Sequence, residues 1–356
     1  MPTKKQITEA ANALTLGELV VMPTETVYGL AADATNEAAV KRIFAAKGRP
    51  ADHPLIVHVR KGDDLSRWAK RLPSHVAPLI AAFWPGPLTL ILKKTDAIPD
   101  VVTGGQNTVG LRCPAHPVAQ ALLDAFAKHG SGIVAAPSAN RFGHVSPTTA
   151  AHVISEFGEL INADKTVAVK KRITLLDGGA CDVGIESTIL DLSGKEPVLL
   201  RPGAVSAEDI ARVIGVMPKS REAVQLANGV MPRVSGDLAA HYAPRTPLQL
   251  LTAAALVVEV DAMLAAAKRV AVLAFAAKPK TAPSPVGIGV RHLRPLIWLQ
   301  APKQVEDYAR DLYASLRTLD AAGTSMIIVE APPSDAAWDA VNDRLSRAAV
   351  GAGKRP

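Results

Sequence analysis

Short apolar runs alternate with helical runs along the first 215 residues, and this alternation restricts the possible folds more than any other feature of the chain. Apolar runs of about four to eight residues that stop at Gly or Pro are typical of buried strands. We therefore predict an α/β domain over residues 1–215. Its expected strands are Glu18–Met22, Leu55–Val59, Leu88–Leu92, Gly132–Ala136, Ser187–Leu192 and Pro197–Leu200.

Three helices of this domain have recognisable ends. The segment Glu37–Lys47 has helical spacing of its apolar residues and is followed by Gly48. Ser206, with Asp209 three residues later, resembles a capping box for a helix over Ala207–Ile214. Ser146 as N-cap and Pro147 as first helical residue are expected to open a third helix.

Regularity is lost after Gly215, where prolines and glycines interrupt every run up to Pro247. We interpret residues 216–247 as a linker that lies over the active site, and residues 248–356 as a second, smaller domain. Alternating strands and helices predict a small, Rossmann-like parallel α/β unit there. Its expected strands are Leu248–Leu251, Arg269–Phe275 and Met326–Glu330, and its expected helices are Thr252–Ala267, Lys303–Ala321 and Asp335–Ala349.

Composition narrows the function classes. The net charge of +7 is spread along the chain without long single-sign runs, which favours anionic ligands and leaves nucleic acid open as a partner. Two cysteines without a Cys-x-x-Cys pattern argue against a disulfide framework and a cysteine zinc site, so we expect no metal site and a reduced, cytoplasmic setting. No apolar stretch predicts a signal peptide or a membrane span.

The first candidate site is the turn Lys47-Gly-Arg-Pro50. The chain has no P-loop and no Gly-x-Gly-x-x-Gly after a strand, so a nucleotide would have to be held by side chains and helix N-termini. Lys47 offers a point charge and Arg49 a bidentate fork for phosphate oxygens. The alternative is a plain helix C-terminus with surface-like cations and Gly48 as its cap.

The second candidate is Pro137-Ser-Ala-Asn140, which follows a predicted buried strand. Ligands of open α/β sheets bind beyond the carboxyl ends of strands. Ser138, Asn140 and Thr148, the last at the expected helix start, are therefore candidate nucleotide contacts. Ordinary turn chemistry remains an alternative, because Ser, Asn and Pro are common in loops.

Polar residues in apolar surroundings suggest a pocket for a small zwitterion. Thr24 and Thr26 flank a glutamate after the first strand and share a face if the segment is extended. Arg112 lies in an apolar stretch, and a buried arginine needs an anionic partner, either internal or bound. His58, within an apolar run, is either a ligand contact or a satisfied core residue.

Two further segments complete the set. Arg201-Pro-Gly203 places another cation at a strand end, held by Pro and Gly. His241-Tyr-Ala-Pro244 is an aromatic pair in a polar linker, and it needs a surface on which to dock. That surface is either a bound ligand or the face of a domain.

In this order, these segments resemble the Sua5/YrdC family of threonylcarbamoyl-AMP synthases, in the Sua5 form with a C-terminal domain. The stretches Asp311–Arg317 and Asp343–Ala348 extend the resemblance to residues after 247. The resemblance implies a catalytic domain with a twisted, mostly parallel sheet around a large basic cavity. It also implies synthesis of L-threonylcarbamoyladenylate from L-threonine, bicarbonate and ATP, with release of pyrophosphate.

Carried onto matching positions, the resemblance implies two sets of contacts. Lys47 and Arg49 become the catalytic cations. The ATP contacts become Arg49, His53, Thr108, Ser138, Asn140, Thr148, Arg201 and Tyr242, with Mg²⁺ accompanying ATP. The L-threonine contacts become Thr26, His58, Arg112 and Ser187. The product would serve N6-threonylcarbamoyl modification of adenosine 37 in tRNA, with transfer proteins and tRNA itself as further partners.

One departure is visible in the linker. The family often has Ser-Pro-Gly-Met-Lys before its His-Tyr-x-Pro, whereas this chain has Ser235-Gly-Asp-Leu-Ala-Ala before His241. A phosphate contact from that lysine is therefore not expected here. Two other functions remain open: an RNA-binding or ribosome-maturation module that uses the basic cavity, and a related carbamoyl-transfer enzyme. Sparse, dispersed aromatics disfavour the first, and the His-Tyr-x-Pro linker disfavours the second.

Overall fold

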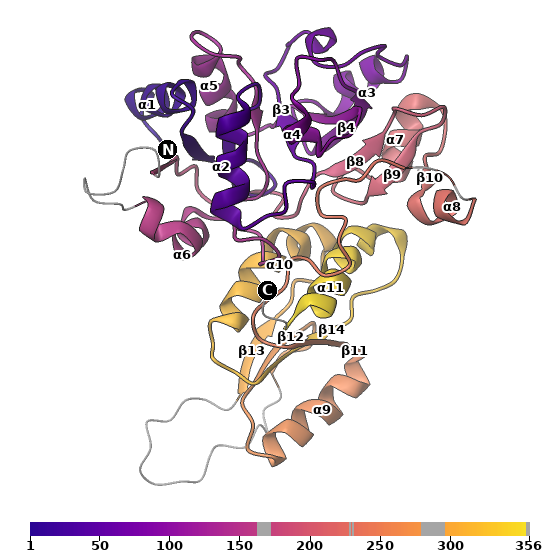
Figure 1. The fold of residues 1–356 in the computed structure, drawn as a ribbon. Helices are drawn as coiled ribbons and strands as arrows, with labels where there is room; N and C mark the ends of the chain where they lie inside the picture. The colour runs from indigo at the N-terminus through magenta and orange to yellow at the C-terminus, as the bar shows by residue number, and fades with distance from the viewer. Residues whose placement is uncertain (162–171, 228, 230, 279–295, 354–356) are drawn as a thin grey trace. The chain divides into compact units, whose positions relative to one another are not determined.

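The chain folds into two compact units, each built around one sheet (Figure 1). The computed structural model describes residues 1–161, 172–227, 229, 231–278 and 296–353. The first unit comprises Met1–Phe142 and Ser146–Asp237, and the second comprises Gly143–Val145 and Leu238–Pro356. The predicted α/β class is confirmed for both.

The sheet of the first unit mixes parallel and antiparallel strands. Its strands are β1 Leu19–Met22, β2 Gly29–Asp33, β3 Ile56–His58, β4 Leu88–Lys93, β5 Thr108–Arg112, β6 Val134–Ala135, β7 Ile173–Leu175, β8 Thr188–Asp191, β9 Val198–Arg201 and β10 Lys219–Ser220. Their order is β10-β9-β8-β4-β5-β3-β6-β2-β1-β7. β3 pairs with β5 and β4 with β8 in parallel, whereas β4 pairs with β5 and β1 with β2 in antiparallel. The six predicted strands are all present, and β2, β5, β7 and β10 add to them.

The helices of the first unit are α1 Lys4–Thr15, α2 Glu37–Lys47, α3 Val76–Phe83, α4 Asp100–Thr103, α5 Pro117–Phe126, α6 Ala150–Ile161, α7 Ala207–Ile214 and α8 Arg221–Leu226. Two of them, α2 and α7, have the predicted bounds. α2 starts after Asn36, whose side chain accepts from the Ala39 N–H, and ends at Gly48 with a φ of 64°. The capping box of Ser206 and Asp209 is present at α7.

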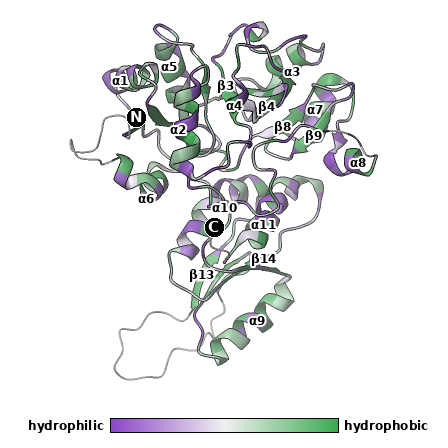
Figure 2. Ribbon diagram, in the orientation of Figure 1, coloured by the Kyte–Doolittle hydropathy of each residue, from purple (hydrophilic) through white to green (hydrophobic). Residues whose placement is uncertain are grey.

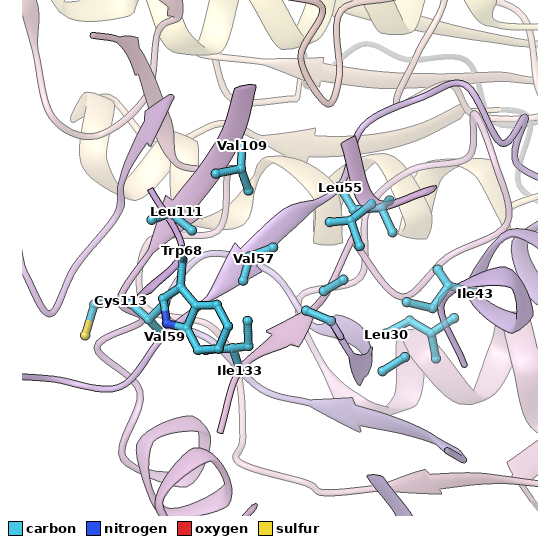
Figure 3. Packing of buried hydrophobic residues seen from close by; sticks show 14 of the residues in the cluster. Leu30, Ile43, Leu55, Val57, Val59, Trp68, Val109, Leu111, Cys113 and Ile133 are labelled. Carbon is cyan, nitrogen blue, oxygen red and sulfur yellow. The ribbon is translucent and has the colours of Figure 1, made fainter. Parts of the chain in front are cut away.

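The core of the first unit lies against the central strands. Figure 3 shows Val57 of β3, Leu111 of β5 and Ile133 lying near the Trp68 ring, and all four side chains are buried. Complete burial of such a side chain contributes about 1.5–3 kcal/mol. A second cluster, which includes Leu14 of α1 and Leu122 and Phe126 of α5, packs around Val20 and Met22 of β1. The strands that carry the candidate site are therefore fixed by apolar packing.

The second unit is a parallel α/β layer. Its elements are β11 Leu248–Leu251, α9 Ala253–Ala265, β12 Val270–Ala274, β13 Leu296–Gln300, α10 Val305–Asp320, β14 Met326–Glu330, a 3₁₀ turn η3 Ala336–Trp338 and α11 Asp339–Gly351. The strand order is β11-β14-β12-β13, with every pairing parallel. Figure 2 shows hydrophobic residues on these strands and along much of α9. The predicted small parallel sheet is confirmed, and β13 is an addition to it.

Two local predictions were wrong. Ser146 does not cap a helix: α6 begins at Ala150, and the Ser146 hydroxyl donates to the buried Glu186 carboxylate at 2.6 Å. The Pro147 carbonyl accepts from the Tyr28 N–H at 2.9 Å, which keeps this stretch out of the helix. The segment after Gly215 is also less irregular than expected, because it contains β10 and α8. None of the described helices is long and apolar enough to cross a membrane.

Candidate active site

Lys47 joins the end of α2 to the Pro137–Asn140 loop. Its side chain is buried, and its Nζ donates to the carbonyl oxygens of Ser138 and Asn140, each at 2.5 Å. The interpretation of Lys47 as a surface-like cation was therefore wrong, although Gly48 does cap the helix. Burial, and secondarily the neighbouring Arg49, lower the pKa of Lys47 well below its usual value.

Arg49 and His53 both contact the aromatic ring of Phe142. The Arg49 guanidinium lies 5.6 Å from the centroid of the Phe142 ring, and its Nη2 donates to the Pro54 carbonyl at 3.1 Å. The His53 ring contacts Phe142 edge-on, with centroids 5.4 Å apart. Partial burial and the Arg49 charge lower the pKa of His53, so its neutral form is favoured. Lys47, Arg49, His53, Ser138 and Asn140 thus form one cationic corner, with Phe142 as a residue that sequence reasoning missed.

Thr148 is buried near the start of α6, but its amide is not available as an anion donor. Both its N–H and its hydroxyl face Nδ1 of His152, at 3.2 and 3.3 Å. Its carbonyl accepts from the Cys181 N–H at 3.0 Å. A contact from Thr148 to a nucleotide would therefore require its hydroxyl to exchange partners.

Arg112 has an internal anionic partner. Its Nη2 lies 2.6 Å from Oε1 of Glu25, and both side chains are buried. The other carboxylate oxygen of Glu25 accepts from the Ala115 N–H at 3.0 Å. Glu25 was noted in the sequence only as the residue between two threonines, and its partner could not be found from local pattern.

The Thr24 and Thr26 hydroxyls lie 2.9 Å apart, on either side of Glu25. His58 is next to Arg112, because the parallel register of β3 and β5 pairs these two residues. Burial, together with the Arg112 charge, lowers the pKa of His58 to about 3. The imidazole is therefore neutral near pH 7, and it contributes hydrogen bonding rather than charge.

Ser187, just before β8, and Arg201, at the end of β9, are joined by hydrogen bonds. Arg201 donates through Nε to the Ser187 carbonyl at 3.0 Å and through Nη2 to the Ser187 hydroxyl at 3.2 Å. That hydroxyl also lies 2.7 Å from the Thr89 hydroxyl. Nη1 of Arg201 donates to the Ser235 carbonyl at 2.8 Å. A predicted ATP contact and a predicted threonine contact are thus direct neighbours.

Thr108 lines a small pocket with Pro54 and Ser235. The Pro54 carbonyl accepts from Arg49 and the Ser235 carbonyl accepts from Arg201, so two residues that line this pocket also bind candidate arginines. Gln106 fixes the neighbouring linker segment, because its side chain donates to the Arg233 carbonyl and accepts from the Arg233 N–H.

Tyr242 belongs to the second unit. Its φ is 60°, its ring centroid lies 5.6 Å from that of Tyr313, and the Arg344 guanidinium lies 5.6 Å from the same ring. The role of Tyr242 in binding ATP stays a prediction. Among the residues with described positions, no group of three His, Cys, Asp or Glu side chains is placed to hold a metal ion.

Comparison with known families covers nearly the whole chain. The model of the Sua5/YciO/YrdC family, described as telomere recombination, matches residues 12–203. The model of the threonylcarbamoyl-AMP synthase C-terminal domain matches residues 205–350. The resemblance found in the sequence is thereby confirmed.

Individual relatives agree. The threonylcarbamoyl-AMP synthase of Pyrococcus abyssi is 38% identical and covers 95% of this chain and 92% of its own length. The threonylcarbamoyl-AMP synthase of Bacillus subtilis is 37% identical, and the match covers 97% of this chain and 93% of that protein. The solved structure of P. abyssi Sua5 complexed with L-threonine matches with a TM-score of 0.83 at 35% identity, covering 99% of this chain and 96% of that one. The chain belongs to the Sua5/YrdC family, in the two-domain form that carries the threonylcarbamoyl-AMP synthase C-terminal domain.

Proposed function

We propose that this chain is a nucleotidyltransferase that makes L-threonylcarbamoyladenylate from L-threonine, bicarbonate and ATP and releases pyrophosphate. One observation supports this most strongly. The first unit buries Arg112 with Glu25 and Arg201 with Ser187, and the same unit contains the cationic corner of Lys47 and Arg49. An ATP-dependent reaction of a small zwitterion requires such a pairing of anion sites.

ATP would bind at the cationic corner and along the Thr108 pocket. Arg49 supplies a planar fork for phosphate oxygens, and Phe142 fixes its orientation. Two of the three Nζ hydrogens of Lys47 are taken by carbonyls, so this lysine positions the Ser138–Asn140 loop and offers its third donor to a phosphate. Mg²⁺ would arrive with the triphosphate, since no described cluster provides a protein cage for it.

L-Threonine would bind around Arg112. Its guanidinium donates through Nε to the Gly86 carbonyl at 3.4 Å and through Nη2 to the Glu25 carboxylate. Nη1 would then receive the threonine carboxylate. The neutral His58 imidazole and the hydroxyls of Thr26 and Ser187 would select for a hydroxyl-bearing side chain, because unpaired buried polar groups reject a ligand that lacks one.

The chemistry needs positioning rather than a protein nucleophile. The threonine amine adds to the carbon of bicarbonate and water is lost, which gives N-carboxythreonine. A carboxylate oxygen of this carbamate attacks the α-phosphorus of ATP, and the bond to the β-phosphate oxygen breaks. Buried cations stabilise the charge that develops on the phosphoryl oxygens and on the leaving pyrophosphate. Water must be excluded because the carbamate decomposes.

The linker assignment remains part of this proposal. Residues 216–247 would cover the site, and Tyr242 would contact ATP, as the resemblance implies. The hydrogen bonds from Arg201 to Ser235 and from Gln106 to Arg233 support the first half of this idea within the first unit. The proposal also includes a cytoplasmic location, use of the product for tRNA modification, and transfer proteins or tRNA as later partners.

The test is incubation of the full chain with ATP, bicarbonate and one amino acid at a time, with pyrophosphate and the adenylate measured together. Formation of threonylcarbamoyl adenylate supports the proposal. Pyrophosphate release with carbamoyl phosphate in place of bicarbonate and threonine would favour carbamoyl transfer. RNA binding without turnover of any amino acid would favour the RNA-binding module.

A further inference from the structure

Three residues of the catalytic domain's sequence are held by the C-terminal unit. Gly143–Val145 belongs to the second unit, although the residues on both sides of it belong to the first. The Gly143 carbonyl accepts from the Ala243 N–H at 2.8 Å, and His144 pairs with Ala243 in a parallel bridge. The Val145 carbonyl accepts from the guanidinium of Arg317 on α10. Every residue of this short segment therefore has a contact within the second unit.

The stretch that carries Ala243 is itself fixed on α11. Nη1 of Arg347 donates to the Leu238 carbonyl at 2.7 Å, and the Arg347 carbonyl accepts from the His241 N–H at 3.3 Å. A Cβ atom on Gly351 would lie 2.8 Å from Cβ of Ala243, so α11 approaches this stretch closely. The segment is thus bound to an ordered surface rather than to another loop.

A buried aromatic cluster adds to this anchor. The Tyr242 ring packs between His241 and Tyr313, with the Arg344 guanidinium on the same ring. Tyr242, Tyr313 and Arg344 are all fully buried. The stretches 311–317 and 343–348, which carry the family resemblance, therefore bind two segments of the chain. Arg317 holds residues 143–145, and Tyr313, Arg344 and Arg347 hold residues 238–243.

The residues on both sides of 143–145 are candidate ATP contacts. Asn140 precedes Gly143 by three positions, and Thr148 follows Val145 by three. Three residues span at most about 10 Å of chain, so fixing the middle of this loop restricts both ends. Phe142, next to Gly143, carries the ring on which Arg49 and His53 pack.

We infer that the C-terminal unit is a positioning element for the ATP site, and that Arg317 is a positioning residue that acts through the Val145 carbonyl. The inference rests on the proposed function only in taking ATP as the ligand of the first unit. The 140–148 loop is already ordered before ATP binds. ATP affinity is therefore not lowered by the entropy cost of ordering this loop. ATP affinity should then depend on Arg317, whereas L-threonine affinity should not.

The experiment compares Arg317→Met, Arg317→Lys and a control, Arg310→Met, in the full chain. Arg310 lies on the same helix, but its side chain pairs with Asp307 and Asp311 at the surface. ATP affinity is measured by calorimetry, KM for each substrate by pyrophosphate release, and amide exchange of residues 141–149 by mass spectrometry. Thermal unfolding establishes that each variant is folded at the assay temperature.

We expect Arg317→Met to weaken ATP binding by roughly fivefold or more and to speed exchange in 141–149, with KM for L-threonine unchanged. Arg317→Lys should restore part of the affinity, and Arg310→Met should match the wild type. Wild-type ATP affinity and exchange in folded Arg317→Met would overturn the inference, as would equal changes for both substrates. ATP binding and amide exchange are measured directly and do not require turnover. If the wild type bound ATP but made no adenylate, the proposed function would be refuted, and the effect of Arg317 on ATP affinity could still be tested.

Discussion

Glu25 and Arg112 form a buried ion pair, with Oε1 and Nη2 2.6 Å apart. The two residues come from separate parts of the chain: Glu25 follows β1, and Arg112 ends β5. The second carboxylate oxygen is bonded to the Ala115 N–H, so both oxygens of Glu25 have partners. The pair fixes the guanidinium that we assign to the threonine carboxylate, and it sets the first prediction.

Glu25→Ala should lower the free energy of unfolding by about 3–5 kcal/mol, because it leaves a buried cation without its partner. Glu25→Gln keeps the shape of the side chain and should cost less. In both variants KM for L-threonine should rise more than KM for ATP. Asp96→Asn, which disrupts an exposed pair with Lys70, serves as the control and should unfold like the wild type. Unchanged threonine kinetics in folded Glu25→Gln would contradict a positioning role for Glu25.

Lys47→Met should lower both stability and activity. The change removes two hydrogen bonds to the Ser138 and Asn140 carbonyls, and each buried acceptor left without a donor costs about 1–3 kcal/mol. Chemical denaturation and steady-state synthesis measure the two effects. Lys41→Met, at an exposed position on the same helix, should change neither.

Arg49→Ala should cost about 2–4 kcal/mol of transition-state stabilisation, because it removes a cation from the proposed phosphate site. The loss should appear in kcat at saturating concentrations of both substrates and in kcat/KM for ATP. If Arg49→Ala turned over substrate as fast as the wild type, the Lys47–Pro50 turn would be only a helix C-terminus capped by Gly48.

His58 predicts a specific pH dependence of stability. The pKa of His58 in the folded state is about 3, below the ordinary value near 6.5. As pH falls, His58 is therefore protonated in the unfolded chain before it is protonated in the folded one. The stabilisation is therefore complete above about pH 6.5 and is lost as pH falls from there toward 3. His58→Gln should flatten the unfolding free energy between pH 7 and pH 5, whereas His129→Gln, at an exposed position, should leave the slope unchanged.

Tyr242→Phe and Tyr242→Ala separate ring contact from hydroxyl contact. The phenylalanine variant keeps the packing against Tyr313 and should unfold nearly as the wild type does. The alanine variant should lose about 3–5 kcal/mol of stability from the second unit, as is typical when a buried aromatic is truncated. If Tyr242 contacts ATP as proposed, adenylate synthesis by folded Tyr242→Ala should fall as well. If the wild type, Tyr242→Phe and Tyr242→Ala all made the adenylate at the same rate, Tyr242 would not contribute to synthesis and the linker would only connect the two domains.

Local signals were sufficient for much of the fold. Apolar spacing and Gly48 predicted the bounds of α2, and the predicted bounds of β11 and β14 match those observed. These elements have strong caps or sharp apolar limits, and tertiary contacts did not shift them. β13 was missed although Pro295 and Pro302 flank its apolar run in the sequence. Ser146 was misread because its hydroxyl bonds to Glu186, forty positions away.

The site was predicted as a set of residues but not as a set of contacts. Motif order selected Lys47 and Arg112 as candidate site residues, yet their partners lie far along the chain: Ser138 and Asn140 for the lysine, Glu25 for the arginine. Nothing in a local pattern distinguishes a solvated lysine from one that holds two distant carbonyls. Such pairings follow from the strand order of the sheet, which depends on contacts between residues far apart in sequence.

The most direct test of the account is pyrophosphate release by the full chain under single omissions. With ATP, bicarbonate and L-threonine together, we predict release matched one to one by threonylcarbamoyl adenylate. Omission of bicarbonate or threonine should abolish both. L-Valine in place of threonine should reduce kcat/KM by more than the roughly 10–200-fold that a single methylene is worth. Equal turnover with valine, or turnover without bicarbonate, would contradict the account.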